Sequence, residues 1–172
     1  SSARAAEIVC NRWLNRDDCL PDAIIVEGAL AGGHLGFNME EVTGWGECTL
    51  QQVCSDVIKV AQKFEQKTGK HIPVIAAGGI FDGSDIARLF KIGVEGVQMA
   101  TRFLATNECS LPDSCKQVII DSKQEDMMIV KSPVGMPGRA VRNNLVESVN
   151  RGEKLPIRCP YHCLRTCNPS EA

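Results

Sequence analysis

The sequence is poor in aromatic residues, in long apolar runs and in excess charge of either sign. Aromatic side chains make up 5% of the 172 residues, tyrosine occurs once, and the formal net charge is −2. Mixed charges near balance provide no basic face, so we expect neither nucleic acid nor a membrane surface as a partner. No apolar run approaches the roughly eighteen residues of a membrane span, and the first residues lack the layout of a signal peptide. We therefore expect a soluble, cytoplasmic protein.

Cysteine, in contrast, is plentiful. There are nine cysteines, and 44% of the chain is hydrophobic, which is enough for one globular core. The cysteine share is below that of disulfide-rich scaffolds. An odd count without a secretory signal favours reduced thiols in a reducing compartment.

Three of the cysteines form a cluster in the tail of the chain, residues 153–172. Cys159, Cys163 and Cys167 are each four residues apart, and His162 lies between two of them. On a helix this spacing places the thiols on one face, where they would bind zinc or an iron–sulfur cluster. The spacing differs from the usual zinc and ferredoxin motifs, so packed free thiols are the alternative. We treat the three as weak candidates and assign no metal ligand.

The hydrophobic pattern predicts an alternation of helices and strands. Helical spacing of apolar residues runs over 2–14, 50–68 and 85–92, and unbroken apolar strands run over 23–26, 72–76 and 96–99. Thr49 is the predicted N-cap of the second helix, and Ser84 is predicted to open the third. The strand–helix–strand order implies a parallel sheet with right-handed crossovers.

The rest of the chain is predicted as long loops with a few short elements. We expect loops over 28–46 and 103–112, a helix over 116–122, a strand over 127–131, an irregular segment over 133–138 and a final helix over 139–150. Only three strand–helix units are present, whereas a (β/α)₈ barrel takes about 250 residues. We therefore expect an α/β fold that is the C-terminal part of such a TIM barrel. Its N-terminal half would lie outside this sequence and pack against it. The barrel part would comprise 1–103 and 139–152, with an insertion over 104–138.

Small and hydroxyl residues end the second and third predicted strands. Gly78 and Gly79 follow the second, and Gln98 to Thr101 close the third. Glycine lets a phosphate approach the main chain without a Cβ in the way, and the following helix would add its N-terminal dipole. Barrels often bind phosphate in the loops after their last two strands. A phosphate-bearing cofactor is thus predicted here, with a tight turn as the alternative for the glycine pair.

Glycines flank one histidine, His34, in the loop after the first strand. Barrel enzymes place catalytic groups at this end of their strands, and histidine can exchange a proton near neutral pH. We therefore predict a catalytic role for His34, the alternative being a structural loop histidine. His71 precedes a strand, at the opposite end, and is predicted to be structural or exposed.

Taken together, residues 27–36, 73–80 and 96–103 resemble the nitronate monooxygenase (2-nitropropane dioxygenase) family, which includes enoyl-ACP reductase II. The resemblance extends over about residues 1–150. It implies an FMN-binding (β/α)₈ barrel with His34 as the catalytic residue and 104–138 as part of a lid over the flavin. The implied cofactor-binding residues are Glu27, Gly32, Gly78, Gly79, Gln98, Met99, Ala100 and Thr101.

Two positions depart from the family pattern. Position 100 is alanine where the family usually has glycine, and position 27 is glutamate where many nitronate oxidisers have glutamine. A carboxylate at Glu27 would change the electronics of a nearby flavin.

Four functions remain open from the sequence. The first is oxidation of alkyl nitronates with O₂ by an FMN-dependent oxidoreductase, in which His34 deprotonates a nitroalkane or holds its anionic form. The second is NAD(P)H-dependent reduction of enoyl thioesters, with an apolar groove lined by Met127, Met128, Val134 and Met136. The third is a metal or redox module built on the cysteine cluster. The fourth is a flavin-free barrel acting on a phosphate substrate. The first, second and fourth imply a small-molecule substrate.

Overall fold

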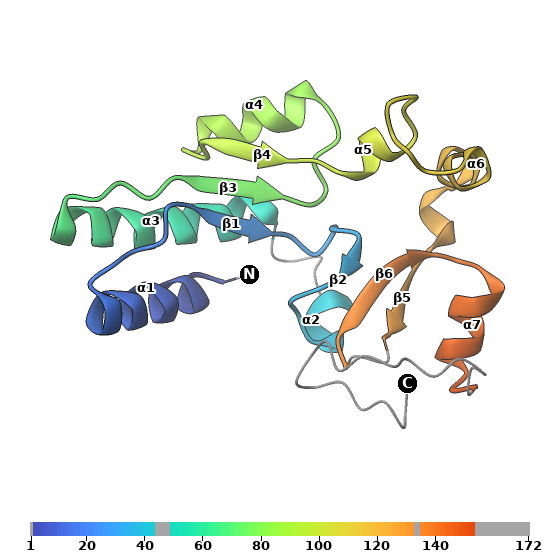
Figure 1. Cartoon of the computed structure of the whole chain (residues 1–172), viewed down its shortest axis with the longest axis horizontal. Helices are drawn as coiled ribbons and strands as arrows, with labels where there is room; N and C mark the ends of the chain where they lie inside the picture. The colour runs from blue at the N-terminus through green and yellow to red at the C-terminus, as the bar shows by residue number, and fades with distance from the viewer. Residues whose placement is uncertain (1, 44–48, 133–134, 154–172) are drawn as a thin grey trace. The chain divides into compact units, whose positions relative to one another are not determined.

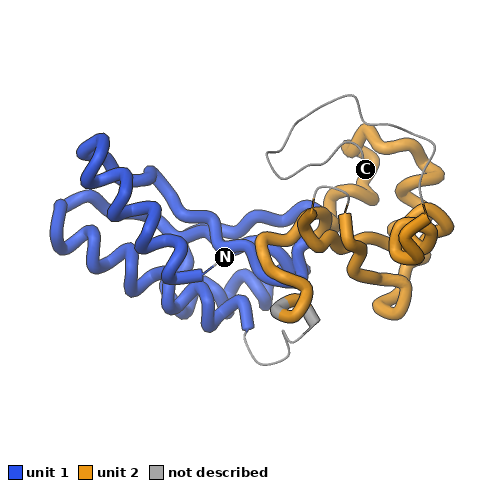
Figure 2. The backbone as a smooth tube through the Cα atoms, turned by 90° about the horizontal axis from the view of Figure 1, so that it is seen from below, with its two compact units in different colours: residues 1–31, 43–100 blue, residues 32–42, 101–172 orange. Residues whose placement is uncertain are grey.

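The computed structural model describes residues 2–43, 49–132 and 135–153, which divide into two compact units. Unit 1 comprises residues 1–31 and 43–100, and unit 2 comprises residues 32–42 and 101–172 (Figure 2). The chain therefore passes from one unit to the other three times.

Unit 1 contains a parallel three-stranded sheet in the order β1-β3-β4. Its strands are β1 (Ile24–Glu27), β3 (Val74–Ala77) and β4 (Gly96–Gln98), and its helices include α1 (Ala3–Asp17), α3 (Leu50–Thr68) and α4 (Gly83–Lys91) (Figure 1). The predicted alternation of helices and strands is confirmed, as is the parallel pairing.

The core of unit 1 lies between α3, the sheet and α1. Helix α3 buries five side chains on one face, at positions 53, 54, 57, 61 and 64, and Phe64 is the largest fully buried side chain of the chain's described part. Each large apolar side chain that is fully buried contributes about 1.5–3 kcal/mol relative to exposure. Cys10 of α1 and Cys54 of α3 are buried in this core, and burial raises the pKa of the Cys54 thiol to about 11. Both thiols therefore stay protonated at neutral pH.

Local capping explains where the helices begin. The Thr49 hydroxyl accepts a hydrogen bond from the backbone N–H of Gln52, as predicted, and Gly69 ends α3 with a φ of 76°. The prediction that Ser84 opens the next helix was wrong. Asp82 is the N-cap, because its carboxylate reaches the backbone N–H groups of Ser84 and Asp85.

Unit 2 is built on an antiparallel sheet in the order β2-β6-β5. Its strands are β2 (Gly33–His34), β5 (Met127–Lys131) and β6 (Pro137–Val141). Its helices are α2 (Met39–Thr43), α5 (Thr101–Leu104), α6 (Asp113–Asp121), the 3₁₀ turn η1 (Gln124–Asp126) and α7 (Asn144–Asn150). The last residue of α2 belongs to unit 1. The strand over 127–131 is confirmed. The helix predicted over 116–122 begins three residues earlier, and the predicted loop over 28–46 contains β2 and α2.

The prediction of one helix over 139–150 was wrong in its first part. Arg139 and Ala140 belong to β6, where they pair with Ile129 and Met128 of β5. The helix starts only after Asn143, whose side chain accepts a hydrogen bond from the backbone N–H of Val146. Pairing with a strand nearby in the chain has overridden a sequence pattern that fits either period.

The remaining parts of the architecture stay predictions. The complete barrel, the lid over 104–138 and the barrel assignment of 139–152 are not tested by these two units. The cysteine tail and Val134 lie outside the described residues. Within the residues that are described, no helix is long and apolar enough to cross a membrane.

His71 ties together the amino ends of two strands and the end of α3. Its Nε2 lies 2.9 Å from an oxygen of Glu95, and its Nδ1 lies 3.1 Å from an oxygen of Glu65. Hydrogen bonds to Glu95 and then to Glu65 raise the pKa of this exposed imidazole above its usual 6.5. The side chain has the structural role that its place before the strand predicts.

We expect His71 to make the stability of unit 1 depend on pH. Because its folded-state pKa is raised, its contribution is full below pH 6.5 and is lost as pH rises through the raised value. The melting temperatures of the natural protein and of His71→Gln should therefore differ most at about pH 5 to 6 and converge at about pH 9. A difference that is constant over this range would contradict the linkage.

Candidate functional site

The carboxyl ends of β3 and β4 lie side by side. Ala77 pairs with Gln98 in the parallel register, so Gly78 and Gly79 leave one strand beside the point where Met99 leaves the other. The sequence prediction that these two ends are neighbours is confirmed. Two loops of small residues meet at one edge of the sheet, where barrel enzymes bind ligands.

One row across the sheet carries two of the predicted cofactor residues. Glu27 pairs with Ala77, which in turn pairs with Gln98. Residues in register on neighbouring strands point to the same face, and adjacent strands are about 4.8 Å apart. Glu27 and Gln98 therefore lie on either side of Ala77 in this row, on one face of the sheet.

The two glycines at the end of β3 fit a close approach of another chain segment. Their φ angles are 84° at Gly78 and 75° at Gly79. A Cβ added to Gly78 would lie 2.9 Å from the Cβ of Ala31, and one added to Gly79 would lie 2.9 Å from the Cβ of Leu30. The tight-turn explanation of the glycine pair thus has direct support, because the fold itself leaves no room for side chains here.

The same geometry leaves hydrogen-bond donors available. Among the described residues, the backbone N–H groups of Gly78 and Gly79 donate to no protein acceptor. Unpaired N–H groups in a glycine turn form an anion-binding concavity. These residues therefore fit the phosphate group of a cofactor, although the fold also requires them as glycines.

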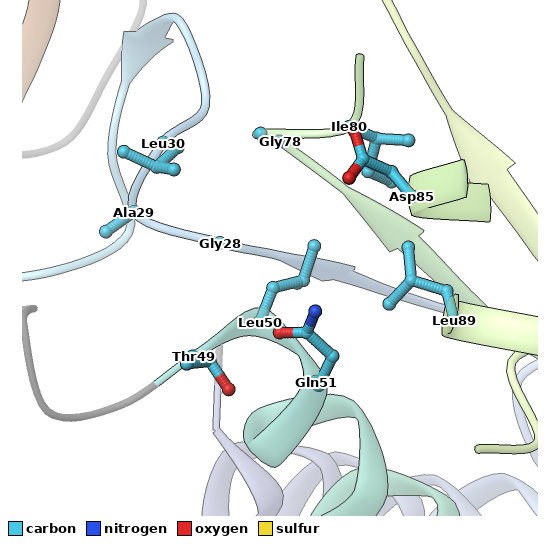
Figure 3. Close-up of a pocket in the computed structure, with 11 residues that line it drawn as sticks. Gly28, Ala29, Leu30, Thr49, Leu50, Gln51, Gly78, Ile80, Asp85 and Leu89 are labelled. Atoms are coloured by element: carbon cyan, nitrogen blue, oxygen red, sulfur yellow. The ribbon is translucent and has the colours of Figure 1, made fainter. Parts of the chain in front are cut away.

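A cavity of about 250 Å³ adjoins these glycines within unit 1. It lies at the ends of β1 and β3, beside the start of α3 and one face of α4 (Figure 3). Thr49 and Gln51 line it from α3, and Asp85 and Leu89 line it from α4.

The start of α4 is capped by two carboxylates of its own. Asp82 accepts hydrogen bonds from Ser84 and Asp85, and Asp85 accepts from the backbone N–H groups of Phe81, at 2.8 Å, and Asp82. The pKa of Asp82 is lowered, first by the Ser84 hydroxyl, and that of Asp85 is lowered, first by the Phe81 N–H. Two ionised carboxylates thus occupy this helix N-terminus, and the dipole contribution to phosphate binding stays a prediction.

His34 lies in β2 of unit 2, with its ring nitrogen bound to a serine. Its Nε2 is 2.7 Å from the Oγ of Ser132, which directly follows β5. If the hydroxyl donates to Nε2, the neutral ring carries its proton on Nδ1. Ser132 was missed at the sequence level because it lies 98 residues from His34, and no local pattern encodes the pairing.

The other predicted site residues are dispersed over the two units. Met99 packs against the core of unit 1, and Ala100 is exposed at its end. Thr101 begins α5 in unit 2, and Gly32 has open space at its Cβ position. Cys159, Cys163 and Cys167 lie outside the described residues, and within residues 2–43, 49–132 and 135–153 no cluster of metal-ligating side chains forms.

Comparison with known protein families decides the family. The model of the family described as nitronate monooxygenase matches residues 1–170. This chain belongs to the nitronate monooxygenase family. The resemblance of residues 27–36, 73–80 and 96–103 is thereby confirmed.

The curated relatives of this chain are named for two different activities. A probable nitronate monooxygenase of Staphylococcus aureus is 33% identical over 135 residues, covering 77% of this chain and 35% of that protein. The (3aS,4S,5R,7aS)-5-hydroxy-7a-methyl-1-oxo-octahydro-1H-indene-4-carboxyl-CoA dehydrogenase of Mycobacterium tuberculosis is 32% identical over 133 residues, covering 77% and 33%. The chain thus spans about a third of the length of these relatives.

Solved structures share the mixed α/β fold. FabK from Thermotoga maritima is 30% identical with a TM-score of 0.64, covering 88% of this chain and 40% of that one. The nitroalkane oxidase from Streptomyces ansochromogenes is 28% identical with a TM-score of 0.65, covering 87% and 39%.

Gly78 provides a test of the close approach in unit 1. Gly78→Ala should cost about 1–2 kcal/mol for its positive φ and about 1–3 kcal/mol more for the contact with Ala31. Gly69→Ala is the matched control, because Gly69 has a φ of +76° and nothing within 4 Å of a Cβ. The free energies of unfolding should be measured with denaturant. Equal losses in the two variants would mean that residues 28–31 move aside freely.

Proposed function

We propose that the protein containing this chain is an FMN-dependent oxidoreductase that oxidises alkyl nitronates with O₂. The observation that carries the proposal is the pairing of Ala77 with Gln98, which brings two small-residue strand ends together at one edge of the sheet. Family membership supports the cofactor and the reaction class.

In this proposal, unit 1 binds the phosphate of FMN. The backbone N–H groups of Gly78 and Gly79 donate to phosphate oxygens, and Met99 and Ala100 contribute the neighbouring backbone. Thr101 adds a hydroxyl, while Glu27, Gly32 and Gln98 contact the flavin. Asp82 and Asp85 remain engaged with the start of α4, so the phosphate charge is met by loop N–H groups.

His34 is the proposed proton-transfer residue. FMN, when bound, supplies the group that accepts electrons from the substrate. His34 removes the α-proton of a neutral nitroalkane. When the imidazole ring is itself protonated, it holds the anionic nitronate instead. Its exposure leaves the ring accessible to a small molecule, and its bond to Ser132 holds the ring in one orientation.

A thioester substrate is the second candidate. The carboxyl-CoA dehydrogenase among the relatives is named for a CoA thioester, and it is about as similar to this chain as the nitronate monooxygenase is. In that case NAD(P)H would supply the electrons and His34 would lie on the path of proton delivery. The metal module at Cys159, Cys163 and Cys167 and the cytoplasmic location stay predictions.

The cofactor should be tested first. The full-length protein is denatured, and the absorbance and mass of the released small molecule are recorded. We expect FMN at about one per chain. A folded protein that releases no flavin would contradict the proposal and favour a phosphate substrate.

Gly32→Ala tests the predicted flavin contact without disturbing the fold. Open space around Gly32 should leave the melting temperature unchanged. A methyl group against the flavin should weaken FMN binding by about ten- to a hundredfold, as overpacking does. Gly83→Ala is the control, because its Cβ also meets nothing within 4 Å. Equal FMN dissociation constants for the two variants would remove Gly32 from the site.

His34→Asn tests the proton transfer. With a neutral nitroalkane, kcat/KM should fall by about 10²- to 10⁴-fold, and with the preformed nitronate it should fall much less. Full activity with the neutral substrate would exclude the role of His34 as base. Anaerobic turnover of NAD(P)H with crotonyl thioester, and no O₂-dependent nitronate oxidation, would select the thioester reaction instead.

A further inference from the structure

A side-chain amide from α7 occupies the outer edge of β5. Strand β5 is the last in the order β2-β6-β5, so one of its edges faces no strand among the described residues. The Nδ2 of Asn150, the last residue of α7, donates to the carbonyl oxygen of Ile129 at 3.2 Å. Its Oδ1 accepts from the backbone N–H of Lys131 at 3.4 Å. The amide of Asn150 therefore stands where a neighbouring strand would pair with β5.

The register of the β5–β6 hairpin shows which main-chain groups lie on this outer edge. The N–H of Arg142 donates to the carbonyl oxygen of Asp126, and the N–H of Ser132 donates to that of Met136. Both bonds cross to the side of β6, and in an antiparallel pair the main-chain groups of successive residues point to opposite sides. Even-numbered residues of β5 therefore face β6. The odd-numbered ones face outward: Met127, Ile129 and Lys131.

Ile129 has one main-chain group engaged and the other open. Its carbonyl oxygen accepts from Asn150, whereas its N–H donates to no acceptor within residues 2–43, 49–132 and 135–153. A strand edge with open main-chain groups is a template for pairing with another strand. The amide of Asn150 closes only part of that template.

We infer that the outer edge of β5 is a pairing surface for the β5 strand of a second copy of this chain, and that Asn150 keeps it closed. In an antiparallel pair, two residues that face each other exchange both of their main-chain hydrogen bonds. A two-fold pair centred on Ile129 needs the N–H and the carbonyl oxygen of that residue in both copies. Because Asn150 holds the carbonyl oxygen, this pair does not form while the amide is in place.

The other groups of the edge are complementary to themselves in this arrangement. When Ile129 faces its copy, the N–H of Lys131 faces the carbonyl oxygen of Met127 in the other copy, and Asn150 holds that N–H as well. The two Lys131 side chains would lie roughly 14 Å apart along the strands, so like charges do not face each other. The residues from Met127 to Val130 are apolar and half-buried, which suits a strand pair.

Asn150→Ala tests the closure in the full-length protein. Self-association is measured by sedimentation over a range of concentrations. The association constant should rise by about 10²- to 10⁴-fold, because two hydrogen bonds in each copy no longer compete with strand pairing. Asn144→Ala is the matched control, since Asn144 is an exposed asparagine of the same helix and makes no hydrogen bond to β5 in the described part of the chain. It should leave the association constant unchanged.

Two further measurements identify the strand that pairs. In Asn150→Ala, the amide of Ile129 should become more protected from hydrogen exchange as the protein concentration rises, because it then donates to the other copy. Adding Ile129→Pro to this variant removes that N–H. Proline is tolerated where the N–H of an edge strand faces outward, so the bonds to β6 remain while the association should be lost.

Three outcomes would overturn the proposal. The first is an association constant of Asn150→Ala equal to that of Asn144→Ala, and the second is association that survives Ile129→Pro. The third is an Ile129 amide that is protected at every concentration in the natural protein, since another segment would then cover this edge. If Asn150→Ala does not fold, Asn150→Ser removes the amide with a smaller change, and the same comparisons decide.

Discussion

The arrangement of unit 1 depends on the close approach of the chain after β1 to the chain after β3. The backbone N–H of Gly28 donates to the carbonyl oxygen of Ala77 at 2.9 Å, and one turn later Ala31 and Leu30 lie where side chains at Gly78 and Gly79 would be. This contact brings both loops to the cavity of unit 1, which they line together. A larger residue at either glycine would displace both strand ends together.

The N-terminus of α4 affects which groups would hold a phosphate beside this contact. A helix N-terminus is a common anion site, but in α4 it already carries the carboxylates of Asp82 and Asp85. These two groups give α4 a well-defined start, and the backbone N–H groups of Ser84 and Asp85 are already bonded to Asp82. An anion beside Gly78 and Gly79 therefore interacts with loop N–H groups and has two fixed negative charges nearby. Binding by neutral donors next to carboxylates favours a ligand that brings further contacts of its own, as the ring system of a flavin does.

Local sequence signals predicted unit 1 well, because its elements are determined by neighbours along the chain. The unbroken apolar strands, the cap at Thr49 and the alternating order were enough to place β3 beside β4. Unit 2 was predicted less well. The segment around Ala140 suits either a helix or a strand, and its pairing with Met128 decided between them. The bond between His34 and Ser132 depends on the register of two separate strand pairs, which no short motif specifies. The start of α4 was predicted at Ser84 for another reason. Asp82 and Ser84 both carry side chains that can cap a helix and lie two residues apart, and only the three-dimensional geometry selects Asp82.

The three crossings of the chain between the units affect how the protein folds. Unit 1 is assembled largely from successive strand–helix–strand contacts, whereas β2 of unit 2 leaves from within the loop that follows β1 and must find β6 about a hundred residues later. Contacts between distant residues carry a larger loop-closure entropy and form more slowly than local ones. The strand that bears His34 therefore depends on a pairing that carries a larger loop-closure cost than the successive contacts of unit 1. A chain that ends before Ser132 would contain the glycine loop of unit 1 but neither Ser132 nor β6, so β2 would lack the strand with which it pairs and His34 would lack its hydrogen-bond partner.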